Sequence, residues 1–240
     1  MGKLISIVLT LLAAGVYFVL LHLYSPTRNA QFSRDFPQGR PDGPTVVIDG
    51  IEWTEAVNWN FKDGHYPTEW RWGEWEIVDG YLHGRDPEGG FAVYFFPYTH
   101  GGDVLLETKV QFLERGGKRK TEAHLLTRDT EDLNFESGFV LVADTNNVHL
   151  RHMAGKRNYI YDIFPVDQRT GYGDWSVIRF AIYENQIRGY LNGERIDVDM
   201  PGLPEQLPVG MYQEPHLAVN SGEARFEYVK IYFAAKPGKP

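Results

Sequence analysis

The sequence contains no cysteine, and this absence excludes one common way of holding a protein at a membrane. A lipoprotein-type anchor needs an N-terminal cysteine, so no such anchor can form. A chain without cysteine is compatible with an oxidising compartment and with a reducing one. The compartment therefore has to be inferred from other features of the sequence.

Charged residues are missing from one long stretch, the run from Leu4 to Tyr24. A helix that rises about 1.5 Å per residue crosses a hydrocarbon core of about 30 Å with roughly twenty residues. A cleaved signal peptide is the alternative, but the first cleavage context after the run, Arg28-Asn29-Ala30, places a bulky cation where a small residue is needed. The sequence therefore predicts an uncleaved transmembrane helix in residues 1–24, with residues 4–24 in the membrane.

A segment rich in proline, residues 25–44, follows the apolar run. Its prolines are Pro26, Pro37, Pro41 and Pro44. Such segments run extended at up to about 3.1 Å per residue. We therefore predict a linker that lifts the remaining domain, residues 45–240, away from the membrane or lies along a neighbouring subunit.

The charges beside the apolar run do not decide its orientation. Lys3 precedes the run, whereas Arg28, Arg34 and Arg40 follow it, so the positive-inside count leans slightly toward a cytoplasmic C-terminal side. The type of domain inferred below is typical of secreted proteins and favours the opposite orientation. The prediction is a single-pass membrane protein with a cytoplasmic N-terminus and a periplasmic or extracellular main domain.

An excess of positive charge is also missing, because the net charge is −8. Phosphate binding needs a concentrated basic face, so the charge argues against nucleic acid and no nucleic-acid partner is predicted. One basic cluster, Arg115–Lys120, surrounds Gly116-Gly117 and predicts a solvated hairpin tip. Contact with acidic lipid or an acidic partner is the alternative for this cluster.

Residues 45–240 lack a helical period and consist of short runs of strand-forming residues that end at turn signals. Three of these turn signals are Asp49-Gly50, Asp79-Gly80 and Asn192-Gly193. The last of them favours a two-residue hairpin, which needs positive φ at both positions. Residues 177–183 are apolar on both faces, which is typical of a strand between two layers. Many short antiparallel strands predict a sandwich or a barrel.

The last strand is predicted at residues 224–233. Phe226, Tyr228, Lys230 and Tyr232 share one parity in it, and Val229 and Ile231 share the other. Successive side chains of a strand point to opposite faces, so strict alternation would place the first four on one side of the sheet.

A series of motifs runs through the domain: Trp70–Leu82, Gly138–Leu141, Trp175–Arg179, Gly189–Gly193, Gly210 and the final strand with Phe226. Their order resembles the concanavalin A-like lectin and glucanase superfamily, in particular its laminin-G-like and 3-keto-disaccharide hydrolase-type domains in secreted bacterial proteins. The resemblance spans most of residues 45–235. It implies an all-β, two-sheet antiparallel jelly-roll sandwich preceded by one transmembrane α-helix, and it says much less about activity.

Catalytic carboxylates are the first functional feature to consider, because glucanases of this superfamily carry them on one strand as Glu-x-Asp-x-Glu. The nearest stretch here has Glu74, Glu76 and Asp79 in a different order. Alternation along a half-buried strand explains Glu74 and Glu76 as its solvent face, with Trp75 and Ile77 inward. No catalytic residue is therefore predicted, and glycoside hydrolysis is the expected reaction if the protein is an enzyme.

Cofactor signals are also scarce. Asp129, Glu131 and Asp132 lie in an oxygen-rich loop that suits calcium, although a solvated acidic turn is the simpler explanation. His149 and His152 are three residues apart on a predicted strand and therefore on opposite faces, which disfavours a shared zinc site. No cofactor is predicted, and calcium is the one metal kept as an alternative.

Two aromatic segments, Tyr94–Tyr98 and Tyr159–Pro165, each contain a proline that marks an edge or a loop. Surface aromatic side chains bind protein partners or stack on sugar rings, and partial burial in the sandwich is the alternative. The candidate contact residues for a partner or a sugar are Tyr94, Phe96, Tyr98, Tyr159, Tyr161 and Phe164.

Together these features predict a membrane-anchored, non-catalytic sandwich that serves as an accessory subunit. In this role it docks on other membrane protein subunits and stabilises a larger complex, for which a photosynthetic or respiratory assembly is one candidate. The alternative is a periplasmic or surface domain, tethered to its membrane, that binds carbohydrate or hydrolyses glycosides.

Overall fold

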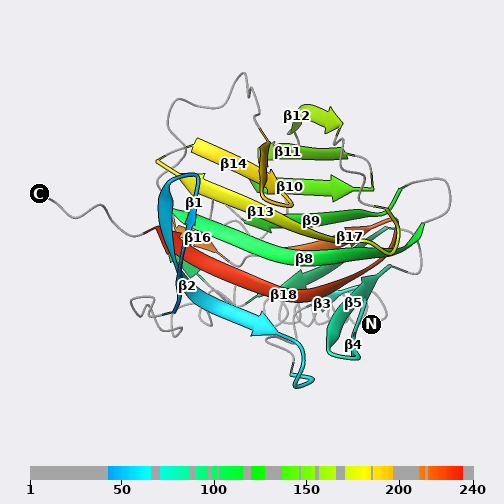
Figure 1. Cartoon of the computed structure of the whole chain (residues 1–240). Helices are drawn as coiled ribbons and strands as arrows, with labels where there is room; N and C mark the ends of the chain where they lie inside the picture. Colours follow the sequence, from blue (N-terminus) through cyan, green and yellow to red (C-terminus); the bar gives the residue numbers. More distant parts are fainter. Residues whose placement is uncertain are drawn as a thin grey trace, which may run out of the picture. The chain divides into compact units, whose positions relative to one another are not determined.

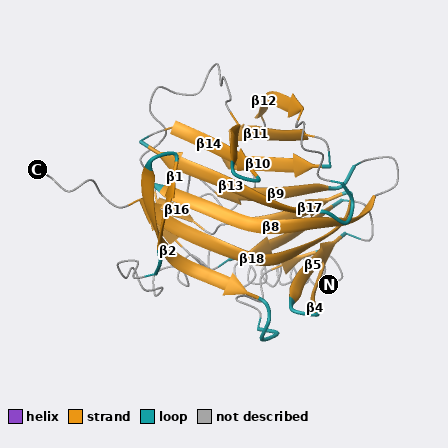
Figure 2. Ribbon diagram, viewed as in Figure 1, coloured by secondary structure: helices purple, strands orange, loops and turns teal. Residues whose placement is uncertain are grey.

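The computed structural model describes residues 43–65, 71–86, 90–96, 99–101, 103–115, 120–127, 137–145, 147–154, 157–165, 171–184, 186–196, 211–213 and 216–234. The chain divides into two compact units, Met1–Pro37 and Gln38–Pro240, and the described residues all belong to the second. Every described element is a strand (Figure 2), which confirms the predicted all-β class. No helix in this part of the chain is long and apolar enough to cross a membrane, and the predicted anchor, residues 1–24, lies outside it.

Nine strands form the larger sheet, sheet A. Its main path runs through β1 (Thr45–Ile48), β2 (Ile51–Asn60), β18 (Gly222–Ala234), β8 (Val104–Arg115), β13 (Trp175–Tyr183), β14 (Gln186–Leu191) and β15 (Glu194–Ile196). The hairpin of β4 (Glu74–Val78) and β5 (Tyr81–Arg85) joins this sheet because β5 pairs with β18. Figure 1 shows β2, β18, β8, β13 and β14 side by side as long, curved strands.

Seven strands form sheet B, which packs against sheet A. Their order is β12 (Arg157–Pro165), β11 (Asn147–Ala154), β10 (Ser137–Asp144), β9 (Glu122–Thr127), β17 (His216–Asn220), β6 (Phe91–Phe95) and β3 (Arg71–Trp72). A small third sheet pairs β7 (Thr99–Gly101) with β16 (Met211–Gln213). The ladders are antiparallel, so the predicted two-sheet antiparallel sandwich is confirmed.

All three predicted turns close two-residue hairpins, which confirms the hairpin predicted at Asn192-Gly193 and extends it to the other two turns. Asp49, Asp79 and Asn192 have φ values of 55°, 53° and 50°, and the glycines that follow them have 74°, 79° and 90°. Positive φ at both central residues matches the twist of the flanking strands. These turns join β1 to β2, β4 to β5 and β14 to β15.

The basic segment Arg115–Lys120 was predicted to be a hairpin tip, and this prediction is wrong. β8 belongs to sheet A and β9 belongs to sheet B, so the segment connects the two sheets. A Gly-Gly pair signals a change of direction but does not reveal whether the next strand pairs with the previous one. Residues 116–119 lie outside the described part of the chain.

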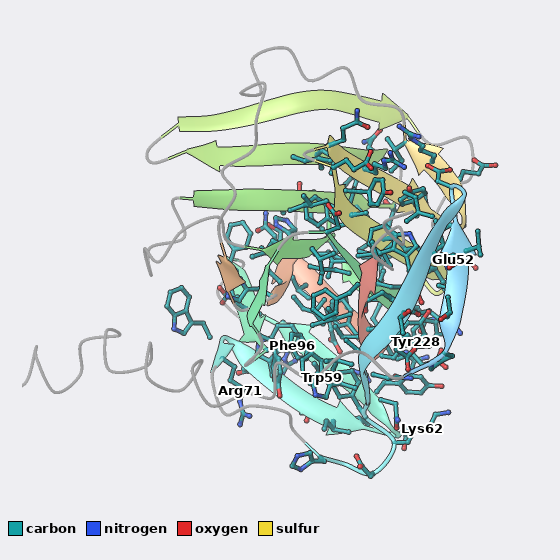
Figure 3. All side chains as sticks on the ribbon, turned by 90° about the vertical axis from the view of Figure 1, so that its left-hand side faces the viewer. Glu52, Trp59, Lys62, Arg71, Phe96 and Tyr228 are labelled. Atoms are coloured by element: carbon teal, nitrogen blue, oxygen red, sulfur yellow. The ribbon has the colours of Figure 1, made fainter. Side chains whose placement is uncertain are left out.

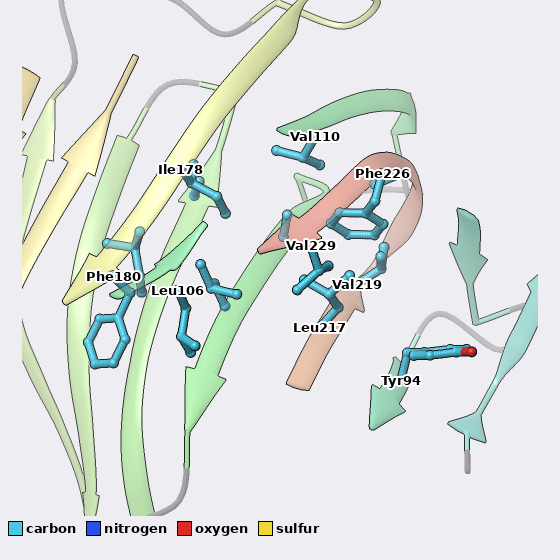
Figure 4. Packing of buried hydrophobic residues seen from close by; sticks show 14 of the residues in the cluster. Tyr94, Leu106, Val110, Ile178, Phe180, Leu217, Val219, Phe226 and Val229 are labelled. Carbon is cyan, nitrogen blue, oxygen red and sulfur yellow. The ribbon is translucent and has the colours of Figure 1, made fainter. Parts of the chain in front are cut away.

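The core lies between the two sheets. Figure 4 shows Phe226 and Val229 of sheet A beside Leu217 and Val219 of sheet B. These four residues belong to one buried cluster with Leu106, Val110, Ile178, Phe180 and Tyr94. β13 lies between β8 and β14, and its Ala181 is buried on the face opposite to Phe180. The prediction of a central strand with two apolar faces is therefore confirmed.

A register shift in β18 corrects the predicted parity of the last strand. Phe226 lies opposite Val110, but Tyr228 lies opposite Lys109, so one extra residue stands between the two pairs. Phe226 consequently faces the core, as do Val229 and Ile231 beyond the bulge. A bulge of this kind reverses the alternation that follows it. It leaves Arg225 and Tyr228 on the same face of sheet A, the outer one.

Candidate functional site

Two of the predicted contact residues, Tyr94 and Phe96, lie in the core. Both are fully buried. The ring centroid of Tyr94 lies 5.3 Å from that of Trp75, and Phe96 stacks on Trp59 at 4.7 Å (Figure 3). The exposure predicted for these two rings is therefore wrong, and the alternative of burial in the sandwich holds for them. Large rings fill a core whether or not a proline follows them.

The remaining predicted site residues are not described at the level of side chains. Tyr98, Asp129, Glu131 and Asp132 lie outside the described residues. Tyr159, Tyr161 and Phe164 belong to β12, the terminal strand in the order of sheet B, and their side chains are likewise outside the description. Their contact roles, and calcium at the acidic loop, stay predictions. In the described part of the chain, no group of three or more histidine, aspartate or glutamate side chains suits a metal ion.

A row of polar and aromatic side chains crosses the outer face of sheet A, the face turned away from sheet B. Its members lie opposite one another on five neighbouring strands: Glu76 on β4, His83 on β5, Arg225 on β18, Gln111 on β8 and Trp175 on β13. Neighbouring strands are about 4.8 Å apart, so the row spans about 19 Å. We refer to these five residues as the cross-strand row.

The Trp175 end of the row holds its side chains in a fixed arrangement. The guanidinium group of Arg225 lies 4.7 Å from the ring centroid of Tyr81 and 5.3 Å from that of Trp175. Arg225 Nε donates a 2.6 Å hydrogen bond to Gln111 Oε1, and Gln111 Nε2 donates to the carbonyl oxygen of Gly173. Cation–π contacts and hydrogen bonds together restrict the rotamers of both rings.

Two further features border this end. Lys109 Nζ lies 5.0 Å from the Trp175 ring centroid and 2.5 Å from a carboxylate oxygen of Glu227. Tyr172, which is 40% exposed, belongs to the turn whose Gly173 N–H donates to Phe112 O at 2.8 Å. The turn that Gln111 contacts thus carries an exposed aromatic ring, which adds apolar surface close to the row.

The opposite end of the row carries a pocket of about 370 Å³. Its lining residues come from β3, β4, β5, β18 and the β3–β4 link: Arg71, Gly73, Glu74, Trp75, Glu76, His83, Arg85 and Glu223. Arg85 Nε donates to Glu74 Oε2 at 2.7 Å, and this pairing raises the pKa of Arg85. His83 Nδ1 lies 3.4 Å from Glu223 Oε1. Charged groups of both signs therefore line the pocket.

The centre of the outer face is held by a buried carboxylate. Glu107 on β8 is 5% exposed, accepts a 2.9 Å hydrogen bond from Tyr228 Oη, and also accepts one from Arg179 Nε. Burial, followed by the charge of Glu107, raises the pKa of Tyr228 above its ordinary value. Hydrogen bonds from a guanidinium group and a phenol stabilise a buried carboxylate, so Glu107 has a structural role in sheet A.

The β1–β2 hairpin covers the far end of the outer face. Trp53 of β2 is fully buried against Leu105, Ala181, Tyr190 and Tyr232, which lie on four other strands of sheet A. The hairpin turn reaches β14 and β15, because Asp49 Oδ2 accepts 3.0 Å hydrogen bonds from Tyr190 Oη and Arg195 Nη1. The β1–β2 hairpin therefore covers this end of the outer face.

Sequence reasoning placed Glu74 and Glu76 on the solvent face of their strand and Trp75 and Ile77 inward, and the burial of β4 confirms this. It did not identify the pocket or the row as a site. Trp175 was noted for the fold alone, and Arg225 was not singled out. A signal was present in the polar residues that alternate along each strand, but the register between strands is needed to bring them together.

Comparisons with known proteins match at the level of the fold. No protein-family model matches the chain, and no curated protein matches it significantly in sequence. Among solved structures, an endo-β-1,3-glucanase from Pyrococcus furiosus matches with a TM-score of 0.56 and 14% identity, over 80% of this chain and 99% of that one. An endo-β-galactosidase from Clostridium perfringens that releases GlcNAcα1-4Gal matches with a TM-score of 0.55 and 12% identity, over 85% of this chain and 67% of that one.

A carbohydrate-binding module from Bacillus subtilis matches with a TM-score of 0.50 and 16% identity, over 65% of this chain and 88% of that one. At such identities the likeness concerns the fold alone. It confirms the predicted concanavalin A-like lectin and glucanase fold. It gives no support to the predicted role as an accessory subunit.

Proposed function

We propose that the protein binds a glycan on the outer face of sheet A. The observation that carries this proposal is the cross-strand row, which places Trp175 at one end and a pocket at the other, with Arg225 and Gln111 between them. Fold likeness to carbohydrate-binding modules and glucanases supports the proposal by analogy. Hydrolysis of the glycan is not part of the proposal.

The chemistry of the row suits a sugar chain. Aromatic rings offer flat apolar surface to the C–H face of a sugar, and fixed polar groups beside them bond its hydroxyls. Trp175 and Tyr81 lie 5.3 Å apart at their ring centroids and are held by Arg225. A site whose side chains are already fixed loses little conformational entropy when the ligand binds.

The N-terminal region gives this activity a proposed location. A membrane helix in residues 4–24 and an extended linker would hold the domain near the membrane surface, on the periplasmic or extracellular side. The protein would then act as a tethered glycan-binding module. An accessory-subunit role is not proposed, because the comparisons give it no support.

The proposal is tested by thermal unfolding of the full chain with a panel of neutral hexasaccharides: laminarihexaose, cellohexaose, maltohexaose and a β-1,4-galactohexaose. The detergent must carry no sugar headgroup, because alkyl maltosides would compete for the site. A ligand that binds only the folded state stabilises it by about 2.7 kcal/mol at 100 times its Kd, so at least one hexasaccharide should raise Tm.

Trp175→Ala is the matched variant for the row. We expect it to weaken the best ligand by about tenfold, because a stacked ring contributes roughly 1.4 kcal/mol. Phe91→Ala is the control, since Phe91 is an exposed ring on β6 of sheet B, 48% exposed. Equal affinity of both variants, or no Tm increase with any hexasaccharide, would contradict the proposal.

A further inference from the structure

The pocket lies where the cross-strand row ends, since Glu76 and His83 belong to the row and also line the pocket. We propose that the pocket receives the terminal residue of a neutral glycan, while the preceding residues lie along the row toward Trp175. This inference rests on the proposed function and adds to it the part of the glycan that is recognised and the charge of its sugars.

The position of the pocket favours a chain end. Arg71 lies on β3 of sheet B, and Gly73 links β3 to β4 of sheet A, so this wall is formed where the backbone passes from one sheet to the other. The link has little room to move, because Gly73 has a φ of 76° and a Cβ there would lie 2.6 Å from Ala92 Cβ. A glycan that extends along the row would meet this wall. A volume of about 370 Å³ is near the lower limit of ligand pockets, which suits one small unit.

Glu76 and His83 each have unused hydrogen-bonding capacity at their side chains. The Glu76 side chain is exposed and makes no side-chain hydrogen bond or ion pair with another described residue, although its charge contributes to the raised pKa of Arg85. His83 Nε2 is enclosed and has no hydrogen-bond partner, and the His83 side chain is 13% exposed. Because Glu223 faces Nδ1, the tautomer with the proton on Nδ1 is favoured and Nε2 is left as an acceptor.

The charges of the pocket favour a neutral sugar. Three glutamates and two arginines line it, so its carboxylates outnumber its guanidinium groups. Arg85 is already paired with Glu74. An anionic sugar would add a like charge beside Glu76 and Glu223, and like charges at close range repel. Uronic acids and sulfated or phosphorylated sugars are therefore disfavoured.

The test is the binding stoichiometry of the full chain, measured by titration calorimetry in the same sugar-free detergent. Each neutral hexasaccharide that binds is compared with a long polymer of the same main-chain linkage: laminarin, a soluble cellulose derivative, amylose or galactan. Recognition of a terminal residue predicts one protein per free chain end at every length. Several proteins per chain end on the long polymer would overturn this inference and leave the proposed function standing, whereas no binding of any neutral glycan would overturn both.

Three further measurements address the residues and the charge. Glu76→Ala and His83→Phe should each weaken hexasaccharide binding by about 3- to 10-fold, the effect of one lost hydrogen bond. Glu52→Ala, an exposed glutamate on β2, is the control and should leave the affinity unchanged. Hexagalacturonate should bind at least about tenfold more weakly than the best neutral hexasaccharide. Unchanged affinity in both pocket variants, or tighter binding of the uronate, would overturn the inference.

Discussion

The two ends of the outer face of sheet A carry the same kinds of side chains and differ in what lies over them. At one end, Trp53 of the β1–β2 hairpin packs against Tyr190 and Tyr232 of the sheet. At the other, Tyr81 and Trp175 flank Arg225, and the row continues into a pocket. Aromatic and charged residues on a sheet face therefore do not define a binding site. The second end differs because its aromatic rings are partly exposed and the row of side chains beside them leads into a pocket.

The largest expected effect separates the covered end from the open one. Trp53→Ala should lower the free energy of unfolding by about 3–5 kcal/mol, because it removes a fully buried ring and leaves a cavity. Trp72→Ala is the matched control, since Trp72 is 55% exposed and its loss should cost less than about 1 kcal/mol. Urea unfolding of the full chain in detergent measures both. Similar losses in the two variants would mean that the hairpin does not bury the face.

The centre of the face should also respond in stability. Glu107→Gln keeps the shape of the side chain but leaves Arg179 without its buried counter-charge, which should cost about 2 kcal/mol. Glycan affinity should change less than twofold, because Glu107 is not part of the cross-strand row. If the variant unfolds like the wild type and binds glycan more weakly, Glu107 belongs to the binding site and does not have the structural role given to it here.

How much of this arrangement could be predicted depends on whether the signal is local. The turns at Asp79-Gly80 and Asn192-Gly193 are set by two residues each, so they could be identified from sequence. The alternation of Glu74, Trp75 and Glu76 is equally local, and its burial was predicted correctly. Such short-range rules also sufficed for the fold class.

Features that depend on partner strands could not be predicted. The bulge between Phe226 and Tyr228 lies where β18, paired with β8 on one side, changes its partner on the other side from β5 to β2. No residue type at this position predicts it. The row from Glu76 to Trp175 joins residues about a hundred positions apart through register alone. Tyr94 and Phe96 were misjudged because a run of aromatic residues does not reveal which face is covered.

Alkaline pH provides a smaller test at the centre of the face. Burial and the charge of Glu107 raise the pKa of Tyr228 and Tyr232 above the ordinary value of 10.0. The folded state therefore holds these protons more tightly than the unfolded state, and the resulting stability is present below pH 10 and lost as pH rises above it. Urea unfolding from pH 8 to 11 should show this decline, and Tyr228→Phe should reduce its slope. An unchanged slope in the variant would mean that Tyr228 does not contribute to the loss of stability at alkaline pH.

The smallest expected effect concerns the hydrogen bonds that join the β1–β2 turn to β14 and β15. Asp49→Asn tolerates the positive φ of the turn but removes the charge that faces Tyr190 and Arg195. The expected cost is about 1 kcal/mol, measured by urea unfolding, with no change in glycan affinity. A gain in glycan affinity would contradict the comparison, because it would mean that the hairpin competes with the ligand for the face.

The most direct test of the central claim is hydrogen exchange of the full chain with and without the hexasaccharide that raises Tm most. Glycan binding at the cross-strand row predicts slower exchange in residues 71–85, 171–179 and 222–228, which carry the pocket, Trp175 and Arg225. Residues 45–53 of the covered end should remain unchanged. Slower exchange confined to sheet B or to the β1–β2 hairpin would contradict the account.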